Sequence, residues 1–185
     1  MSLPAAYLGI ILIWSTTPLA IQWSTEGAGF AFAVLARMAI GTLVAGLLVL
    51  VGRVGFPLHA RARRAYLSGG VGLFGAMALT YWGARYVNSG LVAVLFGLSP
   101  LFAAILAALF LGEQALTPAR IAGTLLGVAG LGVIFMHGDG LGGEHALAGL
   151  LALLAAVLVY SGSLVSLKHI GDDSPPLATT VGTLT

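Results

Sequence analysis

The chain is dominated by long apolar stretches that carry almost no charge, and each is close to the length of a membrane-spanning helix. The hydrocarbon core of a bilayer takes roughly 20 apolar residues per helix. The stretches lack the alternation of strands, and a helix satisfies its own backbone hydrogen bonds in lipid. They run from Pro4 to Trp23, Phe30 to Val51, Tyr66 to Ala84, Gly90 to Leu111, Pro118 to Met136 and Ala146 to Leu167. The sequence therefore predicts an all-α polytopic membrane protein with about six transmembrane helices.

The C-terminal end predicts the start of a further helix. The loop from Gly171 to Pro176 contains two aspartates and two prolines, which end the sixth predicted helix. An apolar segment from Leu177 to Thr185 follows. This segment is too short to cross a bilayer, so we interpret it as the beginning of a seventh helix.

The composition excludes several classes of protein. Of the 185 residues, 59% are hydrophobic and 8% are charged, a balance that a water-soluble fold of this size does not need. The net charge of +2 is small and the basic residues are scattered over loops, which argues against nucleic acid as a partner. Without cysteine the chain forms no disulfide, thiolate nucleophile or cysteine-based metal site.

Basic residues in the short loops predict the orientation, because cytoplasmic loops carry an excess of lysine and arginine. With a cytosolic N-terminus, the predicted outer loops hold only Arg85. The predicted inner loops then hold Arg53, Arg61, Arg63, Arg64, Arg120 and Lys168. We therefore expect a cytosolic N-terminus and a location in a bacterial-type inner (plasma) membrane.

Arg37 is the charged residue that lies well inside a predicted span. A cation at this depth is costly in lipid and faces a cavity, a partner or the interface. One interpretation is that Arg37 snorkels to the outer surface or pairs with a helix C-terminus. The other is that it attracts an anionic group of a substrate or orders a cavity.

Pro18 and Pro100 lie inside predicted helices, where each removes one backbone hydrogen bond and frees the carbonyl four residues earlier. Both prolines are therefore expected to kink their helices, either to shape packing or to line a cavity and act as a hinge. Ser99 is expected either to rebond a freed carbonyl or to face a substrate.

Aromatic side chains with polar tips are candidates for the substrate pathway: Trp14, Tyr81, Trp82 and Tyr160. Such rings suit an amphipathic organic substrate or a cation-π contact. The alternative for Tyr81 and Trp82 is an outer aromatic belt, and the alternative for Trp14 is buried packing.

A weak internal repeat and several glycines bear on helix packing. Trp14-Ser15 aligns without gaps with Tyr160-Ser161, which suggests a second copy that begins at the sixth helix. A unit of five helices would place the second copy in the opposite orientation, as in many secondary transporters. Glycines recur at helical spacing at Gly70, Gly72, Gly75, Gly123, Gly127 and Gly130, which favours close helix packing.

Taken together, the motifs resemble the EamA-like repeat of the drug/metabolite transporter (DMT) superfamily. The motifs are, in order, Trp14-Ser15-Thr16-Thr17-Pro18, Arg37, Tyr81 to Ser89, Leu98-Ser99-Pro100, Leu111-Gly112-Glu113, and the glycines Gly123, Gly127 and Gly130. The resemblance implies a ten-helix inverted-repeat fold, with residues 4–137 as a first repeat of five helices and residues 146–185 as the start of a second. It also makes Glu113 a candidate for a cytosolic gate salt bridge, with Arg120 close in sequence, whereas a solvated loop carboxylate is the alternative.

Signatures of an enzyme are missing from the sequence. No aspartate or glutamate lies within a predicted span, so no intramembrane carboxylate pair is available for acid–base catalysis. The four histidines are His59, His137, His145 and His169. They lie in or beside loops without the spacing of metal ligands. No phosphate-binding motif accompanies the glycines. We expect no metal, no cofactor and no enzymatic activity.

The resemblance implies a secondary transporter that exports small organic metabolites, such as amino acids, amines or drugs, across the inner membrane by alternating access. Its partners would be the lipid bilayer, a small organic substrate, and either a second copy or further C-terminal helices. One alternative is a non-transporting membrane scaffold or an inactive fragment. A membrane-embedded enzyme acting on lipid is less favoured, because convergent carboxylates and histidines are missing.

Overall fold

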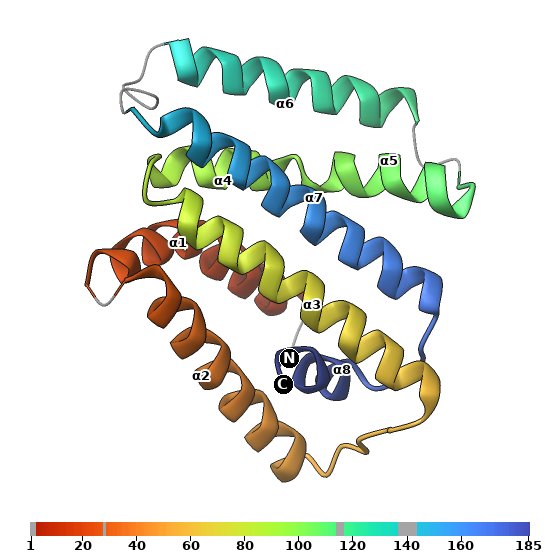
Figure 1. Ribbon diagram of the computed structural model, residues 1–185. Coiled ribbons are helices and arrows are strands. Elements are labelled where there is room, and N and C mark those ends of the chain that lie inside the picture. Colours follow the sequence, from red (N-terminus) through yellow and green to blue (C-terminus); the bar gives the residue numbers. More distant parts are fainter. Residues whose placement is uncertain (1–2, 28, 114–116, 137–143) are drawn as a thin grey trace.

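The computed structural model describes residues 3–27, 29–113, 117–136 and 144–185, and these ranges fold into helices without a strand among them (Figure 1). The helices are α1 (Leu3–Gly27), α2 (Phe30–Val51), α3 (Ala60–Gly83), α4 (Ser89–Gly97), α5 (Ser99–Leu111), α6 (Pro118–Met136), α7 (Ala146–Ile170) and α8 (Pro176–Leu184). The expected start of a seventh helix is α8.

Several helices have the character of membrane spans. Among the described helices, α2, the α4–α5 pair and α7 are long and apolar enough to cross a bilayer. On α2 the outward side chains of Leu43, Leu47 and Leu50 are 67%, 60% and 74% exposed. An apolar surface of this extent is unfavourable in water and favourable in lipid. The protein is therefore an all-α membrane protein, and the further spans expected over α1, α3 and α6 stay predictions.

Capping side chains fix two helix starts. The Asn88 side chain accepts a hydrogen bond from the Leu91 amide at 2.8 Å and caps the start of α4. α3 begins at Ala60 rather than at the predicted Tyr66, because the Nδ1 atom of His59 accepts from the Ala62 amide at 3.1 Å. The cap extends the helix through an arginine-rich turn that precedes the apolar stretch.

The fourth predicted span is two helices in the structure. α4 ends at Gly97 and α5 begins at Ser99, with Leu98 as a turn between them. Pro100 lies in the first turn of α5 and lacks the N–H that a continuous helix would use to bond the Phe96 carbonyl. The interruption thus follows from the proline.

The antiparallel helices α3 and α7 pack along most of their length at the centre of the molecule (Figure 1). Glycines allow this approach: a Cβ on Gly72 would overlap Ser163, and a Cβ on Gly83 would lie 2.9 Å from the Gly149 carbonyl oxygen. α5 packs on α7, and α8 packs between α2 and α3. α6 lies outermost beside α5, and a Cβ added at Gly123, Gly127 or Gly130 would meet no atom of the described residues within 4 Å.

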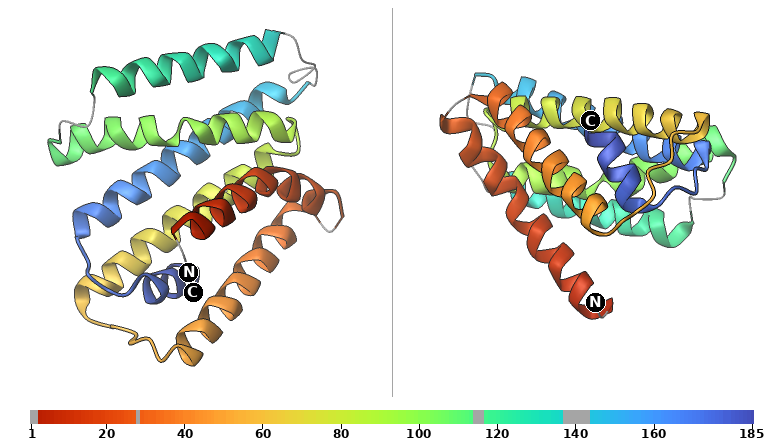
Figure 2. Two further views of the ribbon diagram at one scale, coloured as in Figure 1. Left: turned by 180° about the vertical axis from the view of Figure 1, so that it is seen from behind. Right: turned by 90° about the horizontal axis from the view of Figure 1, so that it is seen from below.

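The apolar core lies at one end of the molecule, where α1, α2, α3, α4 and α7 meet. Its members include Ile21, Val34, Tyr81, Leu91 and Leu153. Away from this end α1 diverges from the other helices (Figure 2). Residues of α1 border a cavity between this helix and its neighbours.

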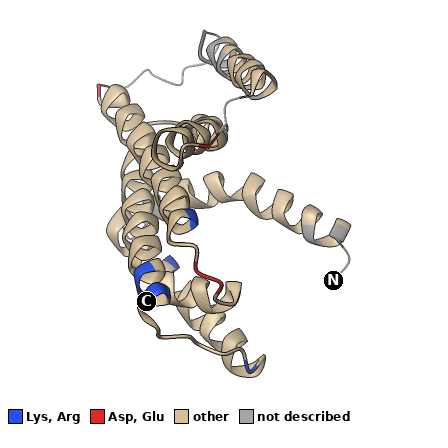
Figure 3. Cartoon of the chain, turned by 90° about the vertical axis from the view of Figure 1, so that its right-hand side faces the viewer, with Lys and Arg blue, Asp and Glu red and all other residues tan. Residues whose placement is uncertain are grey.

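At the opposite end α2 connects to α3 and α7 connects to α8. Figure 3 views this end, and basic residues gather at the start of α3 and in the preceding connection. This is the end that the basic loops predict to be cytosolic, because it contains Arg53, Arg61, Arg63, Arg64 and Lys168.

Candidate functional site

A cavity of about 540 Å³ lies between α1, α2, α3, α4 and α7, and we call it the central cavity. Its lining is mostly apolar, with a small number of polar groups, as is usual for small-molecule sites. The lining includes Trp14, Pro18, Arg37, Thr80, Phe96 and Tyr160.

α1 supplies Trp14 and Pro18, which are four residues apart and therefore lie on one face of the helix. The indole of Trp14 is 54% exposed, so it borders the cavity without being fixed in the core. α1 continues through Pro18. The hydroxyl of Thr17 donates to the Ile13 carbonyl at 2.6 Å, so a side chain reinforces the turn before the proline.

α2 supplies Arg37, with Met38 and Gly41 beside it in the lining. Arg37 is exposed, and no carboxylate of the described residues forms an ion pair with it. Both interpretations that the sequence allows for Arg37, snorkelling to the surface and attraction of an anionic group, stay predictions.

The opposite wall comes from α3, α4 and α7. The rings of Phe96 and Tyr160 pack with centroids 6.2 Å apart. Thr80 is 1% exposed, and its hydroxyl donates to the Ala76 carbonyl at 2.6 Å. This wall therefore presents aromatic surface, and the Thr80 hydroxyl on it is already bonded to the backbone.

The break between α4 and α5 is stabilised by two serines. The Ser99 hydroxyl donates to the Phe96 carbonyl at 2.6 Å, which is the carbonyl that Pro100 leaves free. The Ser161 hydroxyl on α7 donates to the Ser99 carbonyl at 3.2 Å. Ser99 is 8% exposed and is not part of the lining of the central cavity.

A second cavity of about 560 Å³ lies between α5, α6 and α7, and we call it the α5–α6 cavity. Pro100 and Gly97 line it, and Gly97 also lines the central cavity. The break in the fourth span therefore lies between the two cavities.

Glu113 and Lys168 lie at the mouth of the α5–α6 cavity and form an ion pair of 2.7 Å. Gly112, in a left-handed conformation with φ of 64°, ends α5 and turns Glu113 toward α7. The partner of Glu113 is thus Lys168 on α7, at the end that is predicted to be cytosolic. The side chain of Arg120 lies outside the described residues.

Two aromatic candidates from the sequence lie outside the lining of the central cavity, as Ser99 does. Tyr81 is 2% exposed and belongs to the apolar core. Trp82 packs edge-on against Tyr86 with ring centroids 5.0 Å apart. Successive helical residues point in directions about 100° apart. Thr80 therefore lines the central cavity, whereas Tyr81 and Trp82 do not.

Sequence reasoning missed Thr80, Phe96 and Lys168. A polar residue inside an apolar stretch was a usable signal for Thr80. Nothing in the local sequence marks Phe96, because its role depends on the approach of α7. The pairing of Lys168 with Glu113 joins residues 55 positions apart and needs the tertiary structure.

In the described ranges no group of three or more histidine, cysteine, aspartate or glutamate residues could hold a metal. His137 lies outside the described residues. His145 packs against the ring of Tyr86 with centroids 5.5 Å apart, which is a structural contact.

The profile of the EamA-like transporter family matches residues 4–136. The chain belongs to the EamA-like transporter family. Over 134 residues it is 31% identical to a probable terminal-alkyne amino-acid exporter of Streptantibioticus cattleyicolor, a match that covers 69% of this chain and 43% of the exporter. Over 84 residues it is 34% identical to protein PagO of Salmonella typhimurium, which covers 45% of this chain and 27% of PagO. No solved structure matches the chain significantly.

Most residues that line the central cavity lie in the part of the chain that the family profile matches. Trp14, Pro18 and Arg37 all lie in the matched residues, whereas Tyr160 lies beyond them. The chain spans less than half of the length of the curated relatives that it matches.

Proposed function

We propose that this EamA-like protein is a secondary transporter that exports small organic metabolites, with amino acids that carry an apolar side chain as its leading substrate class. The observation that carries the proposal is the interrupted fourth span. Gly97 borders the central cavity on one side and the α5–α6 cavity on the other. Broken helices between cavities are the elements that secondary transporters use for alternating access.

The chemistry of the central cavity supports the substrate class. Arg37 provides a cation without a carboxylate partner among the described residues, which suits a substrate carboxylate. Trp14, Phe96 and Tyr160 provide aromatic surface for an apolar side chain. The printed name of the Streptantibioticus relative, an amino-acid exporter, points to the same class.

The arrangement in the membrane is part of the proposal. Residues 4–137 would form a first repeat, and α7 and α8 would begin a second repeat of opposite orientation. The basic end of the molecule would face the cytosol in an inner membrane. Glu113 and Lys168 would then close the α5–α6 cavity on the cytosolic side as an ion-pair gate.

The test is efflux from vesicles that contain the purified protein. A terminal-alkyne amino acid and leucine are loaded inside, and their release is compared with that from protein-free vesicles. Arg37→Gln should lower the efflux rate about tenfold, the effect of losing one charge-assisted hydrogen bond to the substrate. Arg85→Gln is the matched control, because Arg85 is exposed at the end of α3, outside the central cavity, and stacks on Phe30 and Tyr86.

The same measurement separates a transporter from the alternatives. Vesicles that contain a non-transporting scaffold or an inactive fragment would release substrate no faster than protein-free vesicles. Equal loss of efflux in Arg37→Gln and Arg85→Gln would assign the effect to net charge and remove the specific role of Arg37.

A further inference from the structure

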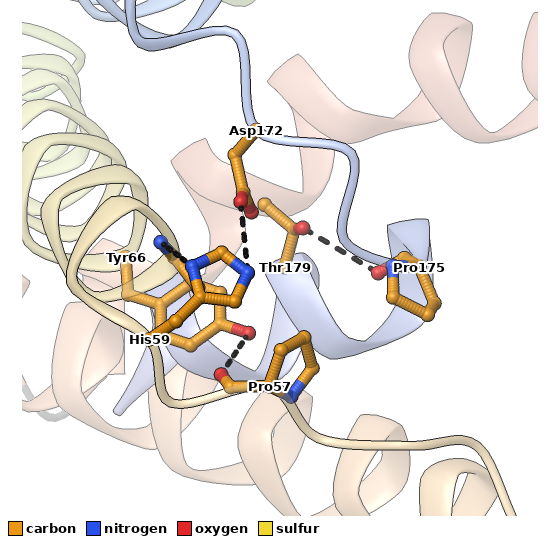
Figure 4. A network of polar contacts seen from close by, with 7 residues as sticks. Pro57, His59, Tyr66, Asp172, Pro175 and Thr179 are labelled. Carbon is orange, nitrogen blue, oxygen red and sulfur yellow. Dashed lines mark hydrogen bonds and ion pairs between the residues drawn. The ribbon is translucent and has the colours of Figure 1, made fainter.

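The connections α2–α3 and α7–α8 lie beside each other at one end of the molecule (Figure 4), and their residues line an open polar pocket of about 350 Å³. Its lining carries both signs of charge and consists of Pro57, His59, Arg61, Asp172, Asp173, Ser174 and Pro175. Neither the central cavity nor the α5–α6 cavity includes any of these residues. The pocket therefore needs an explanation of its own.

Asp172 is the unusual member of this pocket. Its side chain is only 5% exposed, yet neither carboxylate oxygen receives a hydrogen bond from a described residue. The hydroxyl oxygen of Ser174 is buried and unbonded in the same way. A buried carboxylate is unfavourable unless a cation or several donors compensate it, so a partner of Asp172 is expected.

His59 is poorly suited to be that partner. Its Nε2 atom lies 3.5 Å from Asp172 Oδ1, which is too long for a good hydrogen bond. Its Nδ1 atom accepts from the Ala62 amide and caps α3. A doubly protonated ring would give up this cap, so charging His59 to neutralise Asp172 works against the start of α3.

A primary ammonium group fits the unsatisfied atoms. It has three N–H donors and no acceptor, and two lining residues carry three buried, unbonded acceptors, namely both oxygens of Asp172 and the oxygen of Ser174. A metal ion fits less well, because the capping role of Nδ1 leaves the proton of neutral His59 on Nε2, and oxygen-binding cations need more ligands than these. Arg61 lines the same pocket and suits a phosphate next to the ammonium.

The position of the pocket suggests where such a ligand comes from. α2 ends at Val51 and α7 ends at Ile170, and both helices have the character of membrane spans. The pocket lies on the connections that follow these two helix ends, where spans of this length would bring the chain to the lipid headgroups. Tyr66, whose hydroxyl donates to the Pro57 carbonyl at 2.9 Å, holds the α2–α3 connection in place beside it.

We propose that this pocket binds a phosphoethanolamine group, with the ammonium on Asp172 and Ser174 and the phosphate on Arg61. The group is supplied by the headgroup of phosphatidylethanolamine or by a soluble phosphoethanolamine compound. This site is separate from the proposed transport pathway, and its test does not depend on transport.

The test compares lipids that differ in their N–H donors alone. The full chain is extracted from vesicles that contain equal amounts of phosphatidylethanolamine and phosphatidylcholine, and retained lipid is counted by native mass spectrometry. The choline headgroup keeps both charges but has no N–H. The protein should retain phosphatidylethanolamine about tenfold more than phosphatidylcholine, the effect of one or two charge-assisted hydrogen bonds. Equal retention would overturn the proposal.

Variants place the preference at Asp172. Asp172→Asn should abolish the preference, and Arg61→Gln should lower the retention of both lipids. Glu144→Gln, which removes a carboxylate charge from an exposed residue outside this pocket, should leave the preference intact. A wild-type preference in Asp172→Asn, or an equal loss in Glu144→Gln, would contradict the assignment.

Two further measurements cover other outcomes. If Asp172→Asn does not fold, the wild-type protein is tested with N-methylated and N,N-dimethylated phosphatidylethanolamine, and retention should fall with each N–H removed. Unchanged retention across this series would overturn the proposal. Free phosphoethanolamine distinguishes the two sources, since competition by it supports a soluble ligand and its failure to compete supports the bilayer lipid.

Discussion

The Ser161 hydroxyl on α7 donates a hydrogen bond to the Ser99 carbonyl, 3.2 Å away, at the point where the fourth span is interrupted. Ser161 is fully buried. The bond joins the first helix of the expected second repeat to the hinge-like break of the first. A mechanism that moves α5 relative to α4 would therefore act on this bond.

Ser161→Ala should destabilise the protein by about 1 kcal/mol, because it removes the buried hydrogen bond from the Ser161 hydroxyl to the Ser99 carbonyl. The loss is no larger because the Ser99 carbonyl can still be bonded within α5. The midpoint of thermal unfolding in detergent measures the change. Thr180→Ala is the matched control, since the Thr180 hydroxyl is exposed on α8 and bonds the Pro176 carbonyl of its own helix. An equal effect of both substitutions would show that the Ser161 contact contributes nothing specific.

Gly72→Ala should destabilise the protein by roughly 1–3 kcal/mol, because the added methyl group would overlap Ser163 across the α3–α7 contact. Adding Ser163→Gly to Gly72→Ala should recover part of the lost stability, since the Cβ and Oγ atoms of Ser163 are the atoms nearest to the added methyl group. Gly123→Ala on α6 has open space and should be neutral or stabilising by up to about 1 kcal/mol. Unfolding midpoints of the four proteins test the contact, and a neutral Gly72→Ala would contradict it.

Glu113→Gln should lower transport while changing stability by less than about 1 kcal/mol, because the ion pair with Lys168 is partly solvated, with the two side chains 38% and 60% exposed. The charge swap of Glu113→Lys with Lys168→Glu should restore much of the transport. Efflux and the yield of inserted protein are measured together. Normal efflux by Glu113→Gln would remove the proposed gate.

The sequence predicted most of the helices, because a bilayer imposes one simple rule of length and hydropathy. The stretches Phe30–Val51 and Pro118–Met136 are helices with the predicted bounds. α3 starts earlier than its apolar stretch, since a cap rather than hydropathy decides where a helix begins. Helix ends of this kind depend on single side chains.

The candidate site was harder to predict, because the face of a helix that borders a cavity depends on its neighbours. Trp14, Arg37 and Tyr160 were proposed from their chemistry, and the structure places all three around the central cavity. Tyr81 and Trp82 carry the same chemistry but point elsewhere. Their function in a substrate pathway stays a prediction that the structure does not favour.

Labelling of single cysteines tests the central claim most directly, because the chain has no cysteine of its own. Ala93→Cys places a thiol in the lining of the central cavity, and Ala39→Cys places one on the exposed surface of α2, outside that lining. If the central cavity is a water-filled substrate pathway, a membrane-impermeant thiol reagent modifies Ala93→Cys, a transported amino acid protects it, and Ala39→Cys stays unmodified in lipid. Modification of Ala39→Cys alone, or no protection of Ala93→Cys by any amino acid, would contradict the account.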